Sequence, residues 1–221
     1  MADSLSHALL IEKVNAFIDK YQSDLSYAHG TDHVRRVARL AVKIGTMEKA
    51  DCQVIEVAAL LHDIGVVPLG WSRHALGKDE YDFQNFLGLY ALPSADHGEV
   101  GALIAERFLK QIGYPENMIQ QVTKIISEHP TIKQTSPESG IVADADKLDS
   151  LGATWVARAF QRTSAFDRTI GIESIPTKYL IGRESYLPHF YSKTAKEIAT
   201  QRSKFLISFI EQFEREMNLN A

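Results

Sequence analysis

Apolar residues recur along most of this chain with the three- and four-residue spacing of amphipathic helices. The pattern predicts helices over residues 4–21, 31–45, 51–65, 97–112, 116–129, 138–160 and 193–217. Thr31-Asp32 and Asp51 have the residue types that cap helix N-termini, so we place helix starts there. The helix over 51–65 is apolar on almost every side, which is typical of a helix buried in a core.

Two long stretches interrupt this helical pattern, at residues 66–96 and 163–192. Both are rich in Gly, Pro and aromatic residues, and both are longer than ordinary connections, which favours functional loops over simple links. A short helix is expected near 79–90. No run of alternating residues indicates a β-strand, and no composition shift marks a domain boundary. The sequence therefore predicts an all-α fold, with residues 1–221 forming a single helical bundle that carries two irregular surface insertions.

Composition and charge narrow the classes of function. Hydrophobic residues make up 45% and charged residues 24% of the chain, which is an ordinary globular balance. The net charge of −4 argues against coating nucleic acid by bulk charge and against anionic membranes. A single cysteine, Cys52, excludes an intramolecular disulfide and a multi-cysteine metal cluster. Because no signal peptide or membrane-spanning run is evident, we expect a cytoplasmic protein.

Four histidines, each on the apolar face of a different predicted helix, are the most informative residues. They are His33, His62, His97 and His129. Any one of them alone can be explained as a core histidine that is bonded to a backbone carbonyl. Four on separate helices favour a metal site, because helical bundles build such sites from side chains on facing helices.

Acidic partners occur beside one of these histidines and in a second apolar stretch. Asp63 follows His62 directly, while Asp144, Asp146 and Asp149 interrupt the segment IVADADKLDSLG. At about 100° per residue, Asp144 and Asp146 point to nearly opposite sides of a helix, so they do not ligate one ion together. A helix cap or a buried salt bridge is the alternative role for each acid. Imidazole with carboxylate suits a transition-metal ion better than calcium.

The order of these residues resembles the HD-domain superfamily of metal-dependent phosphohydrolases. The matching segments are TDHVRRVA at 31–38, ALLHDIG at 59–65 and DADKLDSLG at 144–152, within a motif-bearing core of about residues 25–165. The resemblance implies that His33, His62, Asp63 and Asp146 bind one divalent ion, and the family register selects Asp146 over Asp144. The ion can be manganese, iron, nickel, cobalt or magnesium.

By the same resemblance, His97 and His129 match additional histidines of relatives that bind two metal ions. They are expected either to hold a second metal or to bind substrate phosphate. Val66 stands where relatives that cleave cyclic di-guanylate carry lysine, and residues 64–67 lack the acids of relatives that hydrolyse alarmones. Neither substrate is therefore favoured.

The implied activity is hydrolysis of a phosphate ester or anhydride in a small molecule, with a nucleotide as the favoured substrate. Asp63 is the expected catalytic residue, and a nearby acid such as Glu128 is an alternative for orienting the attacking water. Phosphate also needs cationic partners. The candidates are Arg36, Lys147, Arg158 and Arg162.

Two other functions stay open, a di-iron oxygenase of the same superfamily and a non-catalytic nucleotide-sensing module. Homo-oligomerisation is compatible with the sequence.

Overall fold

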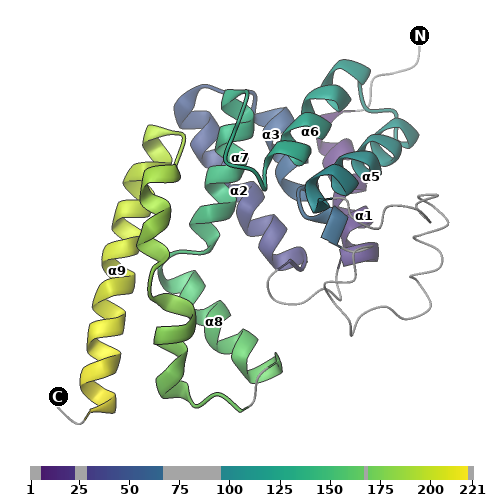
Figure 1. The fold of residues 1–221 in the computed structure, drawn as a ribbon. Coiled ribbons are helices and arrows are strands. Elements are labelled where there is room, and N and C mark those ends of the chain that lie inside the picture. The colour runs from purple at the N-terminus through teal and green to yellow at the C-terminus, as the bar shows by residue number, and fades with distance from the viewer. Residues whose placement is uncertain (1–5, 23–28, 67–95, 167–168, 219–221) are drawn as a thin grey trace. The chain divides into compact units, whose positions relative to one another are not determined.

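The computed structural model describes residues 6–22, 29–66, 96–166 and 169–218 (Figure 1). Helices make up the regular structure of these residues, and no strand occurs among them. The prediction of an all-α fold is therefore confirmed. None of the described helices is both long enough and apolar enough to cross a membrane. The helix expected near 79–90, with nearly all of the first insertion, lies outside the described residues.

The chain divides into two compact units, Met1–Ala143 and Asp144–Ala221. One helix, α7 (Pro137–Asp149), contributes residues to both. Each unit has its own internal packing and is described by itself below. The organisation of residues 1–221 as a single domain stays a prediction.

The first unit is built around a buried central helix. Its elements before α7 are α1 (His7–Gln22), α2 (Thr31–Glu48), α3 (Cys52–Leu61), the 3-10 helix η1 (Ile64–Val66), α5 (His97–Gln111) and α6 (Glu116–Glu128). Helix α3 packs against α1, α2 and α6, and α5 packs against α6 and η1 (Figure 1). All residues from 57 to 66 are buried, as the apolar pattern of this segment predicted.

Local capping explains where two of these helices begin. The Asp51 carboxylate accepts hydrogen bonds from the backbone N–H groups of Gln53 and Val54, at 3.0 and 3.3 Å, so the predicted cap of α3 is confirmed. At α2 the cap differs by one residue from the prediction. Gly30 is the N-cap, with an extended backbone and no side-chain hydrogen bond, and Thr31 is already helical.

A close backbone contact brings η1 against α5. A Cβ atom on Gly65 would overlap the carbonyl oxygen of His97 and would lie 2.5 Å from the backbone nitrogen of Gly101. Only a residue without a Cβ atom allows this approach. Gly65 therefore sets the distance between the end of the α3 segment and the first turn of α5.

Among its described residues, the second unit contains two long helices and three short ones after the end of α7. They are α8 (Gly152–Phe166), the 3-10 helix η2 (Ile172–Ser174), the π-helix η3 (Pro176–Leu180), the 3-10 helix η4 (Arg183–His189) and α9 (Lys193–Met217). Helix α9 packs against α8, η3 and η4. The stretch 163–192, expected to be irregular, thus holds the end of α8 and three short helices.

The single helix predicted from residue 138 to 160 is wrong, because the chain breaks between α7 and α8. Gly152 has a φ of +73°, a conformation that glycine adopts without strain. Helix α7 ends with the tight bonds Ser150 N–H to Lys147 O and Leu151 N–H to Leu148 O, both 3.1 Å. The Arg202 guanidinium also donates to the Leu148 carbonyl at 2.5 Å. These three hydrogen bonds satisfy the Lys147 and Leu148 carbonyls, which the end of the helix would otherwise leave exposed.

Replacing Gly65 by alanine should destabilise the protein, because the new methyl group meets backbone atoms that cannot rotate away. We expect a loss of about 1–3 kcal/mol in the free energy of unfolding, measured by urea denaturation. The matched control is Gly171→Ala, whose Cβ would meet only the flexible carboxylate of Glu173 and should change stability by about 0.5 kcal/mol or less. Equal stability of the two variants would show that the η1–α5 contact is not close-packed.

Candidate metal centre

Asp63 is the centre of a buried cluster of histidines in the first unit. Its side chain is 5% exposed and follows the C-terminal end of α3. One carboxylate oxygen, Oδ2, lies 2.7 Å from His29 Nδ1, 3.4 Å from His33 Nε2 and 3.4 Å from His62 Nε2. These three histidines come from the turn before α2, the first turn of α2 and the C-cap of α3.

The other oxygen of Asp63 faces two further histidines. Oδ1 lies 3.9 Å from His97 Nε2 and 3.7 Å from His129 Nε2, and the two Nε2 atoms are 3.2 Å apart. His97 is the first residue of α5, and His129 is the C-cap of α6. These distances place the two histidines beside each other on the Oδ1 side of Asp63, and their role as ligands of a second metal or of phosphate stays a prediction.

Backbone carbonyls orient two of the imidazole rings. His62 Nδ1 donates to the Ala59 carbonyl at 2.8 Å, and His129 Nδ1 donates to the Ile126 carbonyl at 2.6 Å. Because Nδ1 of each ring is used by a carbonyl, Nε2 is the nitrogen that lies toward Asp63, 3.4 Å from it in His62 and 3.7 Å in His129. Metal-binding histidines in proteins are held by the same kind of hydrogen bond.

The histidines around Asp63 keep its carboxylate negatively charged. Burial by itself would raise the pKa of Asp63, but the charge of His62 and the hydrogen bonds from His129, His29 and His33 together hold it well below the usual value. Burial and the neighbouring His129 lower the pKa of His97. A charged carboxylate with imidazole nitrogens around it is a typical donor set for a divalent transition metal.

The donor atoms have spacings that a metal ion can bridge. The ligand atoms of His62, Asp63 and His129 all lie within 4.8 Å of one another. Two nitrogens bound to one ion at about 2.1 Å in tetrahedral geometry are separated by about 3.4 Å. The 3.2 Å between the Nε2 atoms of His97 and His129 is close to that value. The residues present in the first unit therefore fit a metal centre.

His29 is a member of the cluster that the sequence did not single out. It lies before the first turn of α2, so the criterion of an apolar helical face could not select it. The available signal was its position four residues before His33, in the short stretch HGTDH. Its 2.7 Å hydrogen bond to Asp63 is the shortest contact that the carboxylate makes with the five histidines.

Glu128, the alternative acid for orienting water, is used in a local network. Its carboxylate accepts hydrogen bonds from the Thr135 N–H at 3.0 Å, from the Thr135 hydroxyl at 2.5 Å and from the Ser139 hydroxyl at 2.7 Å. Burial would raise the pKa of Glu128, but these hydrogen bonds lower it below the usual value. The residue holds the segment between α6 and α7 in place, next to His129.

In the second unit, the two aspartates of α7 that compete for the ligand role have different surroundings. Asp144 is fully buried and accepts hydrogen bonds from the backbone N–H groups of Tyr191 and Ser192, at 2.8 and 2.7 Å. Its carboxylate thus anchors the start of α9. Burial, partly offset by those hydrogen bonds, raises the pKa of Asp144. Asp146 is half-buried on the same helix, and its role as a metal ligand stays a prediction.

The basic residues expected to bind substrate are distributed over both units. Arg36 is half-buried on α2, Lys147 is half-buried on α7, and Arg162 is exposed on α8. Arg158 is buried, and its guanidinium donates to the Asp149 carboxylate at 2.7 Å and to the Asp149 carbonyl at 3.1 Å. This ion pair accounts for the burial of Arg158, and substrate binding by the four residues stays a prediction.

Known proteins resemble this chain along almost its whole length. The family model described as HD domain matches residues 30–151. The uncharacterized protein YpgQ of Bacillus subtilis is 31% identical over 218 residues, which is 93% of each chain.

Solved structures show the same fold. The structure of Bacillus subtilis YpgQ in complex with ADP is 24% identical, with a TM-score of 0.69, and covers 96% of this chain and 97% of its own. A predicted HD superfamily hydrolase from an uncultured Thermotogales bacterium is 27% identical, with a TM-score of 0.64, and covers 96% and 99%. The HD-domain model spans more than half of the chain and includes the histidine cluster around Asp63 except His29. The chain therefore belongs to the HD-domain family.

Proposed function

We propose that this protein is a metal-dependent phosphohydrolase that cleaves a phosphate ester or anhydride of a small molecule. The observation that carries the proposal is the buried Asp63 carboxylate, which has histidines facing each of its two oxygens. Relatives described as HD superfamily hydrolases support the reaction class. A nucleotide is the favoured substrate, since a structure of the relative YpgQ is in complex with ADP.

The proposed ligands of the first ion are His33, His62, Asp63 and Asp146. When bound, a divalent ion lowers the pKa of a water molecule and neutralises charge that develops on a phosphoryl oxygen. Asp63 would act both as a ligand of the ion and as the acceptor that orients the attacking water. The Ala59 carbonyl keeps the His62 ring in the orientation that the site requires.

We assign His97 and His129 to a second ion rather than to phosphate. The Ile126 carbonyl holds the Nδ1 side of the His129 ring, so Nε2 is the nitrogen that faces the site. Imidazoles that are oriented in this way by a backbone carbonyl are typical metal ligands. The spacing of the two Nε2 atoms supports the same assignment. Asp63, with one oxygen toward each group of histidines, would contribute a ligand to each ion.

A second candidate function is oxidation by a di-iron centre, because the same two-ion arrangement would hold two irons. The metal content and oxygen consumption of protein purified with and without air separate the two functions. Two bound irons with oxygen consumption, and no release of phosphate from nucleotides, would favour the oxygenase.

Asp63→Ala should be the most damaging single change to activity. It removes a metal ligand and the group that orients water, so we expect the turnover number to fall about a thousandfold or more. The measurement is phosphate release from a nucleotide panel with each divalent metal added to chelated protein. Circular dichroism should show unchanged helical content, and Glu12→Ala, an exposed acid of α1, is the control. Near wild-type turnover by Asp63→Ala would contradict the mechanism.

His129→Ala should bind one ion per chain where the wild-type protein binds two. The reason is that Nε2 of His129 is one of the few ligands available on the Oδ1 side of Asp63. Metal analysis after dialysis against manganese measures the stoichiometry. If His129 binds phosphate instead, both proteins will hold the same number of ions and only the KM for substrate will rise.

The variants Asp144→Asn and Asp146→Asn should show which aspartate has a structural role and which one is a metal ligand. At position 144 the new amide NH2 group places a donor against one of the two backbone N–H groups, so the free energy of unfolding should fall by about 1–3 kcal/mol. Asp146→Asn should keep its stability but lose metal affinity and activity. Urea denaturation and metal titration of both variants provide the test. The opposite pairing of effects would move the ligand role to Asp144.

A further inference from the structure

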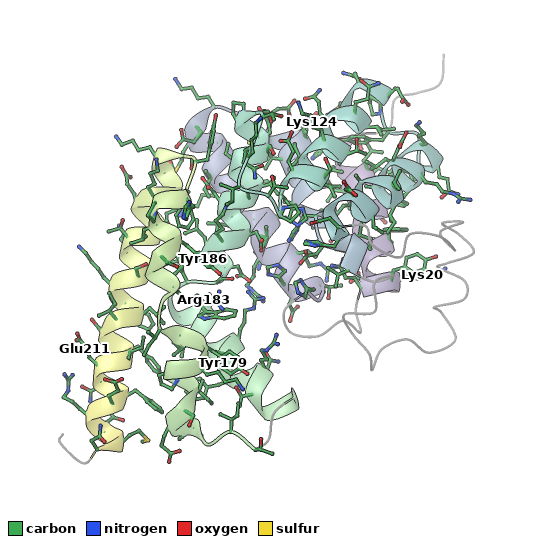
Figure 2. The ribbon with its side chains drawn as sticks, viewed as in Figure 1. Lys20, Lys124, Tyr179, Arg183, Tyr186 and Glu211 are labelled. Carbon is green, nitrogen blue, oxygen red and sulfur yellow. The ribbon has the colours of Figure 1, made fainter. Side chains whose placement is uncertain are left out.

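Arg183 of the second unit is held between two aromatic rings. Its guanidinium carbon lies 4.2 Å from the centroid of the Trp155 ring and 5.5 Å from that of Tyr186. Nη1 donates to the Tyr186 hydroxyl at 2.7 Å, and Nε donates to the Tyr179 carbonyl at 3.3 Å. Figure 2 labels Tyr179, Arg183 and Tyr186, which come from the neighbouring short helices η3 and η4. The side chain is therefore fixed in one orientation.

The residues next to Arg183 are also held in place by packing and hydrogen bonds. The Trp155 side chain is largely buried in α8, and its indole N–H donates to the Tyr179 carbonyl at 2.8 Å. The same carbonyl thus accepts from both Trp155 and Arg183. An arginine that is already ordered by its neighbours loses little conformational entropy when it binds a ligand.

The charge of Arg183 has no carboxylate partner among the described side chains. Its two hydrogen bonds go to neutral oxygens and use two of the five N–H donors of a guanidinium. Arg158, which lies 5.3 Å from the same Trp155 ring, shows the contrast, because Asp149 neutralises it at 2.7 Å. The remaining N–H donors of Arg183 are of the kind that bind an anionic ligand, and its neighbours already hold the guanidinium in place.

We propose that Arg183 is an anion-binding residue of the second unit that takes a phosphate group, with Trp155 and Tyr186 as positioning residues. The proposal rests on the proposed function for the phosphorylated nature of the ligand. Guanidinium presents parallel N–H donors that match two oxygens of a phosphate. The aromatic rings hold that donor edge in place, and the stacked geometry is one that lysine cannot reproduce.

The test is calorimetric titration of the full chain in EDTA with inorganic pyrophosphate, ADP and adenosine as separate probes. Arg183→Met keeps an apolar side chain against Trp155 but removes the charge. We expect its Kd for pyrophosphate and for ADP to rise about tenfold to a hundredfold. Arg183→Lys should recover part of that loss, and Tyr186→Phe should weaken binding severalfold. Lys204→Met, which removes an exposed cation of α9, is the matched control and should bind like the wild-type protein.

Three results would overturn the proposal. They are unchanged affinity of Arg183→Met for both anions, an equal loss for uncharged adenosine, and no binding of pyrophosphate by the wild-type protein. Thermal unfolding of each variant shows whether it is folded, and rescue by lysine excludes a purely structural effect. A further outcome separates this proposal from the proposed function. If Arg183→Met loses anion binding but the wild-type protein turns over no phosphate compound, the anion site is supported and the phosphohydrolase activity is contradicted.

Discussion

The buried carboxylate of Asp63 imposes the main constraint on the first unit. A carboxylate taken out of water costs many kcal/mol unless charged or hydrogen-bonding groups compensate it. Here three histidines face one oxygen and two face the other, and they come from α2 and the turn before it, the end of α3, α5 and α6. The separate helices must keep one relative arrangement for all five to reach a single side chain. The same arrangement gathers ring nitrogens around the carboxylate, and these are also metal-binding groups, which is why a structural requirement and a metal site coincide.

Backbone contacts make that arrangement possible. The missing Cβ atom of Gly65 lets η1 approach the first turn of α5, which brings His97 close to Asp63. The carbonyls of Ala59 and Ile126 then fix the rings of the two histidines that end α3 and α6. Rigid positioning of this kind means that little rearrangement is needed when a divalent ion binds, because the ligands already lie at compatible distances.

In the second unit, some charged groups are neutralised by partners within the protein, whereas Arg183 has no carboxylate partner among the described side chains. Asp144 is satisfied by the backbone at the start of α9, and Arg158 is satisfied by Asp149. Arg183 has aromatic neighbours and neutral acceptors instead. Groups of the first kind stabilise the fold, whereas a charge of the second kind gains its partner from a ligand. Residue type alone does not distinguish them.

The sequence by itself determined the helical elements, the cap of α3 at Asp51 and the inward position of His33, His62 and His129, because these follow from local spacing and local hydrogen bonding. The resemblance to the HD-domain family added the expectation that His62 and Asp63 bind the same ion. Only the tertiary structure decided the rest. His29 joins the cluster from outside any helix, and Gly152 breaks a helix that apolar spacing had continued. The partners of Asp144 and Arg183 lie far along the chain, so their roles depend on packing between distant segments that no local pattern records.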